Sequence, residues 1–129
     1  MTRRTSLKYS FNFKNYSSPE ITDQTKLIEL CVENGTKYQV DFDSKNYQIF
    51  YYSYIYNDKQ YWAFLNQEQV KTFDAQFKLR LTNMIDENGR NEADWTFVLA
   101  PGQKMLKCLN VVEQFEKVSA SFSSSYIVK

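Results

Sequence analysis

The chain has 129 residues, of which 43% are hydrophobic and 17% aromatic, and its formal net charge is +1. A chain of this length folds as one domain and buries a core without needing disulfides. Its near-zero charge argues against a dedicated polyanion-binding protein, which normally carries a basic surplus on one face.

The sequence lacks several features that catalytic and metal sites commonly use. It contains no histidine, the commonest general base and metal ligand. Its three glycines, Gly35, Gly89 and Gly102, are too widely separated to build a phosphate-binding loop. The serines near the C-terminus have no histidine to activate them. We therefore expect no enzymatic activity, no cofactor and no metal site.

The two cysteines, Cys31 and Cys108, are far apart in the sequence and have no metal ligands beside them. We interpret them as two buried thiols, with one disulfide between distant strands as the alternative. The first residues contain no apolar run of the kind that a secretory signal has, and no apolar stretch is long enough to span a membrane. We expect a cytoplasmic protein, unless a leader has been removed.

The N-terminal segment predicts an arm, a strand and a loop. We expect residues 1–5 to form a mobile arm. Strict alternation of apolar and polar residues predicts a half-buried strand over Leu7–Phe13. Turn-forming residues around Pro19 then predict a loop over residues 15–24.

Residues 25–33 allow two interpretations. Alternation of Ile28, Leu30 and Val32 with polar neighbours favours a strand, which would join the next strand through a hairpin turn at Asn34-Gly35. The alternative is a helix from Pro19 to Asn34, with proline early and glycine just past its end.

The next strand contains Tyr38, Val40 and Phe42, and a turn over Asp43–Asn46 leads from it into an aromatic hairpin over Tyr47–Phe64. Half of the residues in this hairpin are aromatic, and Asn57-Asp58-Lys59 break it into two strands. Apolar residues occupy both faces of its first strand. Both faces must therefore be covered, one by the domain's own core and the other by a second layer, a partner or a ligand.

The second half of the chain continues with strands. Phe73–Leu81 alternates most clearly, and an exposed connection over residues 84–94 leads to a short apolar strand, Trp95–Leu99. Pro101-Gly102 predicts a turn. Met105–Val112 is either a strand or the start of a helix running to Lys117. The last strand is Val118–Val128, which lacks the charges and prolines that usually protect a sheet edge; it is either internal or an edge that pairs with another chain.

Short strands at intervals of roughly ten residues predict an all-β, single antiparallel β-sandwich that occupies residues 1–129. The part from Phe73 onward, with its long strand and its Pro101-Gly102 turn before two further strands, resembles the C-terminal half of immunoglobulin-like sandwiches. That resemblance implies an architecture and no functional residues. The alternative fold is a small β-barrel with one helix, at Pro19–Asn34 or at Gln103–Lys117.

The aromatic hairpin is the predicted binding region. Tyrosine and tryptophan are enriched at protein interfaces. We therefore interpret the protein as a non-enzymatic interaction or structural module, a subunit of a larger assembly with a protein partner or a second copy of itself. The alternative is single-stranded nucleic-acid or carbohydrate binding, in which aromatic rings stack on bases or sugars. The candidate binding residues are Tyr52, Tyr54, Tyr56, Tyr61 and Trp62.

Overall fold

A computed structural model describes residues 2–9, as backbone only, and residues 23–129. The elements are β1 (Thr2–Tyr9), α1 (Gln24–Asn34), β2 (Thr36–Phe42), β3 (Lys45–Tyr56), β4 (Lys59–Asn66), β5 (Phe73–Thr82), β6 (Met84–Ile85), β7 (Glu92–Leu99), β8 (Lys104–Val111) and β9 (Val118–Val128). The second half of the predicted strand Leu7–Phe13 and most of the loop predicted after it lie outside the described residues.

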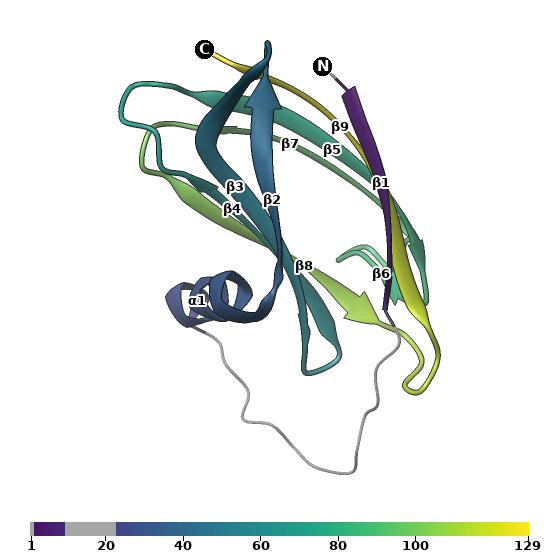
Figure 1. Ribbon diagram of the computed structural model, residues 1–129. Coiled ribbons are helices and arrows are strands. Elements are labelled where there is room, and N and C mark those ends of the chain that lie inside the picture. Colours follow the sequence, from purple (N-terminus) through teal and green to yellow (C-terminus); the bar gives the residue numbers. More distant parts are fainter. Residues whose placement is uncertain (1, 10–22) are drawn as a thin grey trace.

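The strands form two antiparallel sheets that pack face to face (Figure 1). One sheet has the order β1-β9-β5-β7 and the other has the order β2-β3-β4-β8-β6. This arrangement confirms the predicted all-β sandwich, and it is not a closed barrel. The likeness to immunoglobulin-like domains is one of architecture. Strands β2, β3 and β4 form a meander of consecutive hairpins at one side.

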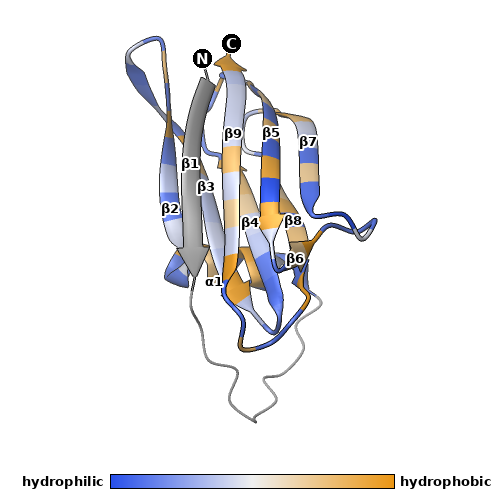
Figure 2. Ribbon diagram, turned by 90° about the vertical axis from the view of Figure 1, so that its right-hand side faces the viewer, coloured by the Kyte–Doolittle hydropathy of each residue, from blue (hydrophilic) through white to orange (hydrophobic). Residues whose placement is uncertain are grey.

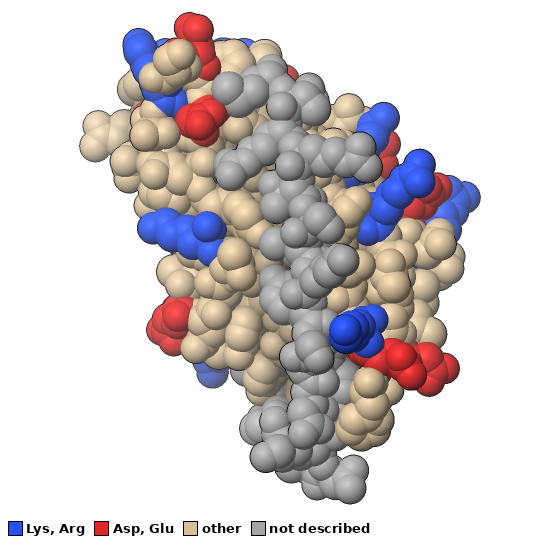
Figure 3. All heavy atoms as spheres, turned by 45° about the vertical axis from the view of Figure 1, so that its right-hand side comes forward, with Lys and Arg blue, Asp and Glu red and all other residues tan. Residues whose placement is uncertain are grey.

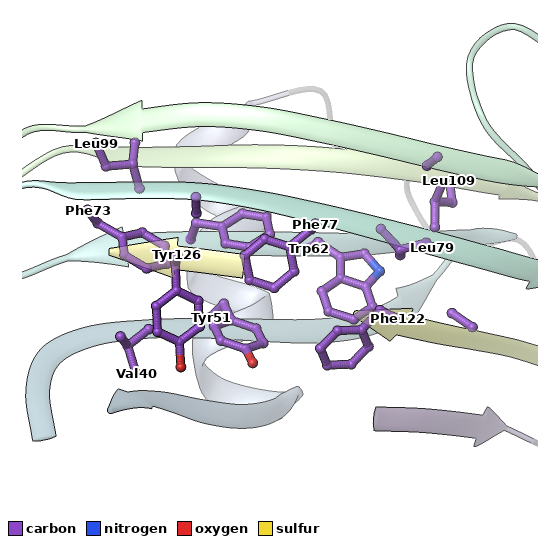
Figure 4. Packing of buried hydrophobic residues seen from close by; sticks show 14 of the residues in the cluster. Val40, Tyr51, Trp62, Phe73, Phe77, Leu79, Leu99, Leu109, Phe122 and Tyr126 are labelled. Carbon is purple, nitrogen blue, oxygen red and sulfur yellow. The ribbon is translucent and has the colours of Figure 1, made fainter. Parts of the chain in front are cut away.

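Aromatic side chains fill the space between the two sheets (Figure 4). Phe73, Phe77 and Leu79 of β5 all point inward, as their alternation with polar residues predicts. The ring of Tyr51 from β3 lies between the sheets, 5.0 Å from Phe77 and 6.2 Å from Phe122 of β9, measured between ring centroids. Edge-to-face rings at such distances add stability beyond the area that they bury.

The tight turns of the meander match the sequence prediction. In both of them, Asp43-Ser44 and Asn57-Asp58, the two central residues have positive φ angles, between 50° and 63°. Two-residue turns of this kind match the twist of the strands that they join, and Asn and Asp tolerate the left-handed conformation.

The strand prediction for residues 25–33 is wrong, because these residues belong to helix α1. Asp23 caps the helix, accepting a hydrogen bond from the Thr25 backbone N–H at 2.9 Å. The Gly35 N–H closes the other end on the Cys31 carbonyl, so Asn34-Gly35 ends a helix and forms no hairpin. In a helix the same segment places Leu27, Ile28 and Cys31 on one face, and this is the face that α1 buries.

Three further expectations are resolved by the strands and their pairing. Residues 2–5, for which we expected a mobile arm, pair with β9 as the first half of β1. Strand β9 lies between β1 and β5, so the last strand of the chain is internal and offers no free edge. The segment predicted over Met105–Val112 forms strand β8, Lys104–Val111, and not a helix.

Candidate functional site

The predicted binding residues lie on opposite faces of the sheet that contains the aromatic hairpin. Trp62 points into the sandwich, where it is fully buried, and its indole N–H donates to the Gln60 side-chain oxygen at 2.9 Å. It therefore offers no surface to a partner. Tyr52, Tyr54, Tyr56 and Tyr61 lie on the outer face.

Helix α1 supplies the second layer that the doubly apolar hairpin requires (Figure 1). Its apolar face packs on Tyr52 and Tyr61, which are only 5% and 7% exposed. Burial raises the pKa of the Tyr52 hydroxyl and raises the pKa of the Cys31 thiol to about 12. Both cysteines are unbridged, as we expected, although Cys108 is only half-buried.

Only two of the five candidate residues keep partly exposed rings beside the helix. Tyr54 and Tyr56 follow one another along the outer face of β3 and stack with their centroids 6.5 Å apart. Lys59 lies directly opposite Tyr56 in the register of β3 and β4, on the same face. The remaining outer aromatic surface is therefore a small tyrosine pair with one cation beside it.

A different surface, the free edge of β7, has the features of a binding site. The outermost described strands are β1, β7, β2 and β6, and β8 is also uncovered on one side from Lys104 to Leu109. Side chains of β1 lie outside the description, β6 has two residues, and β2 is interrupted by a register shift between Gln39 and Asp41. Strand β7 has eight residues in unbroken register with β5, and it contains no proline, lysine or arginine. Natural edges are usually protected by such features.

Hydrogen bonding leaves every second residue of β7 with unused backbone groups. The Leu81 N–H donates to the Asn91 carbonyl at 2.8 Å, and bonded and non-bonded pairs alternate along an antiparallel ladder. The odd-numbered residues of β7 therefore bond to β5. Thr72 and Lys129 exchange two backbone hydrogen bonds, so the even-numbered residues of β5 bond to β9. The odd-numbered residues of β5 are then the ones that bond to β7, in agreement with this assignment. The backbone groups that point to the open edge belong to Glu92, Asp94, Thr96 and Val98.

The inward side chains of β7 are aromatic and only half-buried. Trp95 lies 6.1 Å from Trp62 and Phe97 lies 4.8 Å from Phe64, measured between ring centroids. The rings of β4 that they contact, Trp62 and Phe64, are fully buried, whereas Trp95 and Phe97 lie on the outermost strand and keep part of their surface exposed. Figure 2 shows β7 as the outermost strand of its sheet, with hydrophobic and hydrophilic bands alternating along it.

The facing sheet is also open at this side of the sandwich. Its outermost strand, β6, pairs only with Asn110 and Val111, so from Lys104 to Leu109 β8 pairs with β4 on one side and has no strand on the other. Met105 and Leu109 of β8 point inward, and so by alternation does Lys107, which lies opposite Trp62. The inward side chains at these two edges are thus two rings of β7 and a thioether and an ammonium group of β8, and this side of the sandwich is called the opening below.

Sequence reasoning identified Trp95–Leu99 as a short strand but did not identify its aromatic residues as a site. The signal was weak: Trp95 and Phe97 alternate with Asp94, Thr96 and Val98, as in any half-buried strand. Only the pairing of distant segments makes β7 an edge, and one strand's own residues do not determine that pairing.

Other surfaces of the described residues show fewer features of a binding site. The outer face of the sheet β1-β9-β5-β7 has a shallow polar depression where Lys78 and Arg80 of β5 lie opposite Asp94 and Glu92 of β7. The face shown in Figure 3 likewise interleaves basic and acidic side chains. Among the described residues no group of His, Cys, Asp or Glu side chains could hold a metal ion, and no helix is long and apolar enough to cross a membrane.

A scan of protein-family models and a search of curated proteins found no match to this sequence.

Proposed function

We propose that this protein is a non-enzymatic protein-interaction module, a subunit of a larger assembly, that binds an extended segment of a partner protein along β7. One observation carries the proposal: β7 is a long edge strand in unbroken register, without proline, lysine or arginine, and it has half-buried aromatic residues on its inner side. Extended peptides bind such edges by adding a strand, with backbone hydrogen bonds giving affinity and side-chain pockets giving specificity.

The edge offers both kinds of contact. A bound strand would exchange hydrogen bonds with the backbone of Glu92, Asp94, Thr96 and Val98. Each such bond contributes a net of about 0.5–1.5 kcal/mol. Every second side chain of that strand would lie opposite Trp95 and Phe97 and point into the opening between the sheets. Apolar side chains at those positions would complete the burial of both rings.

The charge of β7 favours a different protein over a second copy as its partner. Glu92 and Asp94 are exposed on its outer side, and the strand has no basic residue. Pairing two copies of β7 would place four carboxylates along one ribbon, where like charges on neighbouring strands are destabilising. A segment with neutral or basic residues at its outward positions avoids this repulsion.

The direct test uses proline to remove a free amide without breaking the sheet. Random peptides displayed on phage are selected on the immobilised full chain, and the affinity of each selected peptide is then measured by fluorescence anisotropy. Thr96→Pro deletes an N–H that points away from β5, and edge strands tolerate proline at such positions. We expect this variant to weaken binding tenfold or more, which corresponds to about 1.4 kcal/mol.

Glu87→Pro is the matched control. Glu87 is the second residue of a turn closed by the Gly89 N–H on the Asp86 carbonyl, a position where the φ angle of proline is favourable. We expect it to bind as the unmodified chain does. Failure to select any peptide, or equal affinity for the Thr96→Pro variant with its thermal unfolding unchanged, would overturn the proposal.

Stacking of a single-stranded nucleic acid or a carbohydrate on the hairpin is the alternative function. The observation that favours it is the stacked pair Tyr54–Tyr56 with Lys59 on the same face. A labelled oligonucleotide, titrated at two salt concentrations, tests it. Salt-sensitive binding that is lost in Tyr54→Ala and kept in Thr96→Pro would favour this alternative over the β7 edge.

The proposed location is the cytoplasm. Two unbridged thiols, Cys31 and Cys108, are what a reducing compartment maintains.

A further inference from the structure

We infer that Lys107 selects partner segments that carry an acidic side chain, Asp or Glu, at the inward position beside Trp95. This inference rests on the proposed binding of an extended segment at the β7 edge, and it specifies the chemistry of that segment. Lys107 lies on the other border of the same opening, on β8.

The direction of the Lys107 side chain follows from the register of β8. Residues directly opposite one another in an antiparallel pair share a face, and Lys107 is opposite Trp62, whose ring is fully buried between the sheets. Its neighbours two positions away, Met105 and Leu109, pack against the same core. A lysine on the inner face of a sandwich is an exception to the usual rule that charged side chains point outward.

Lys107 forms no ion pair with a carboxylate among the described residues. The only ion pair formed by described side chains joins Lys129 and Asp74, and both acids of β7 point to the outer face. Gln60, diagonal to Lys107 on the same face, adds a buried amide nitrogen that has no acceptor within the described part of the chain. This region of the interior therefore has more hydrogen-bond donors than acceptors.

Binding of a segment at the β7 edge would change the free-energy cost of the charge on Lys107. In the free protein Lys107 is only half-buried as a residue. A strand added along β7 would cover the opening, and an ammonium group that loses water without gaining an acceptor is strongly unfavourable. A carboxylate from the bound segment would satisfy it, and a segment with an apolar residue at that position would leave it unpaired. Lys107 thus favours segments with an acidic residue at this position and disfavours segments with an apolar one.

The test compares peptides selected on three forms of the full chain: unmodified, Lys107→Glu and Lys104→Glu. Lys104 is on the same strand, but it lies opposite Leu65, so its side chain is on the outer face. It is therefore the control for the change of charge alone. Among peptides that lose affinity for Thr96→Pro, we expect Asp or Glu at one fixed position on the unmodified and Lys104→Glu chains. On Lys107→Glu that position should prefer Lys or Arg.

Measured affinities of single peptides then test the ion pair between Lys107 and the acidic residue of the peptide. Replacing the acid by its amide in a selected peptide should weaken binding to the unmodified chain roughly tenfold, and should leave binding to Lys107→Met unchanged. Peptides that depend on Thr96 but show no acidic preference, or the same preference on Lys107→Glu, would overturn this inference and leave the β7 edge in place. If no selected peptide depends on Thr96, both the edge and the inference fail.

Discussion

Gly35 sets how closely helix α1 approaches the sheet. Its backbone is extended, with φ −81° and ψ 171°, so no unusual conformation demands glycine here. A Cβ atom at this position would lie 2.5 Å from the Cys31 carbonyl oxygen and 2.7 Å from the Ser53 carbonyl oxygen. Both obstacles are backbone atoms, which cannot rotate away.

We therefore expect Gly35→Ala to lower the free energy of unfolding by about 1–3 kcal/mol, as overpacking does, in urea denaturation. Gly89→Ala is the comparison, because Gly89 has open space around it and a φ angle of 76°. The loss of stability in Gly89→Ala should come from its backbone conformation alone. A smaller loss for Gly35→Ala than for Gly89→Ala would show that the helix can move away from β3.

The Cys31 thiol gives a prediction with a definite sign in pH. Burial raises its pKa to about 12 in the folded protein, above the ordinary thiol value of 9.0. As the pH rises past the lower value, the unfolded chain loses this proton first, so the free energy of unfolding decreases from about pH 9 upward. At pH 10 the loss should be about 1–2 kcal/mol relative to pH 7.

The difference in unfolding free energy between the unmodified chain and Cys31→Ala isolates this group from other titrating residues. That difference should shrink between pH 7 and pH 10. A constant difference would mean that Cys31 ionises equally in both states and that α1 does not bury it.

At the scale of elements, replacement of Phe77 tests whether the inner face of β5 is assigned correctly. Its ring is fully buried and contacts rings from β3, β4, β7 and β9. We expect Phe77→Ala to cost about 3–5 kcal/mol in the free energy of unfolding. A loss below about 1 kcal/mol would mean that the inner face of β5 is assigned incorrectly.

Removal of β9 tests its internal position. Deleting residues 119–129 takes away the strand that pairs with both β1 and β5. We expect the truncated chain to lose its cooperative thermal transition, monitored by circular dichroism. A truncated chain that still unfolds cooperatively would contradict the pairing of β9 on both sides.

Alternation along the chain predicted most of the strands but could not decide between competing patterns of similar strength. Residues 25–33 satisfy a strand pattern and a helix pattern at once, and the helix forms because its apolar face covers the outer side of β3 and β4. The aromatic hairpin has apolar residues on both faces, so its sequence could not indicate that Trp62 faces the core and Tyr52 faces a helix. The need for a second layer was predictable, whereas its identity depended on a segment from elsewhere in the chain.

At the scale of the whole molecule, the edges of the two sheets determine how the protein meets others. With β9 internal, the self-association route that its sequence suggested is closed, and the acids of β7 oppose pairing between copies. We expect light scattering at micromolar concentration to give the mass of one chain, 15.4 kDa. A stable dimer that Thr96→Pro dissociates would instead make a second copy the occupant of the β7 edge.

Amide hydrogen exchange, followed residue by residue, tests the β7 edge most directly. In the free protein the amides of Ala93, Trp95, Phe97 and Leu99 bond to β5 and should exchange slowly, whereas those of Glu92, Asp94, Thr96 and Val98 should exchange fast. Addition of a selected peptide should slow the second set and leave α1 and the outer tyrosines unchanged. Protection that appears on α1 or near Tyr54, with the β7 amides still fast, would contradict binding at this edge.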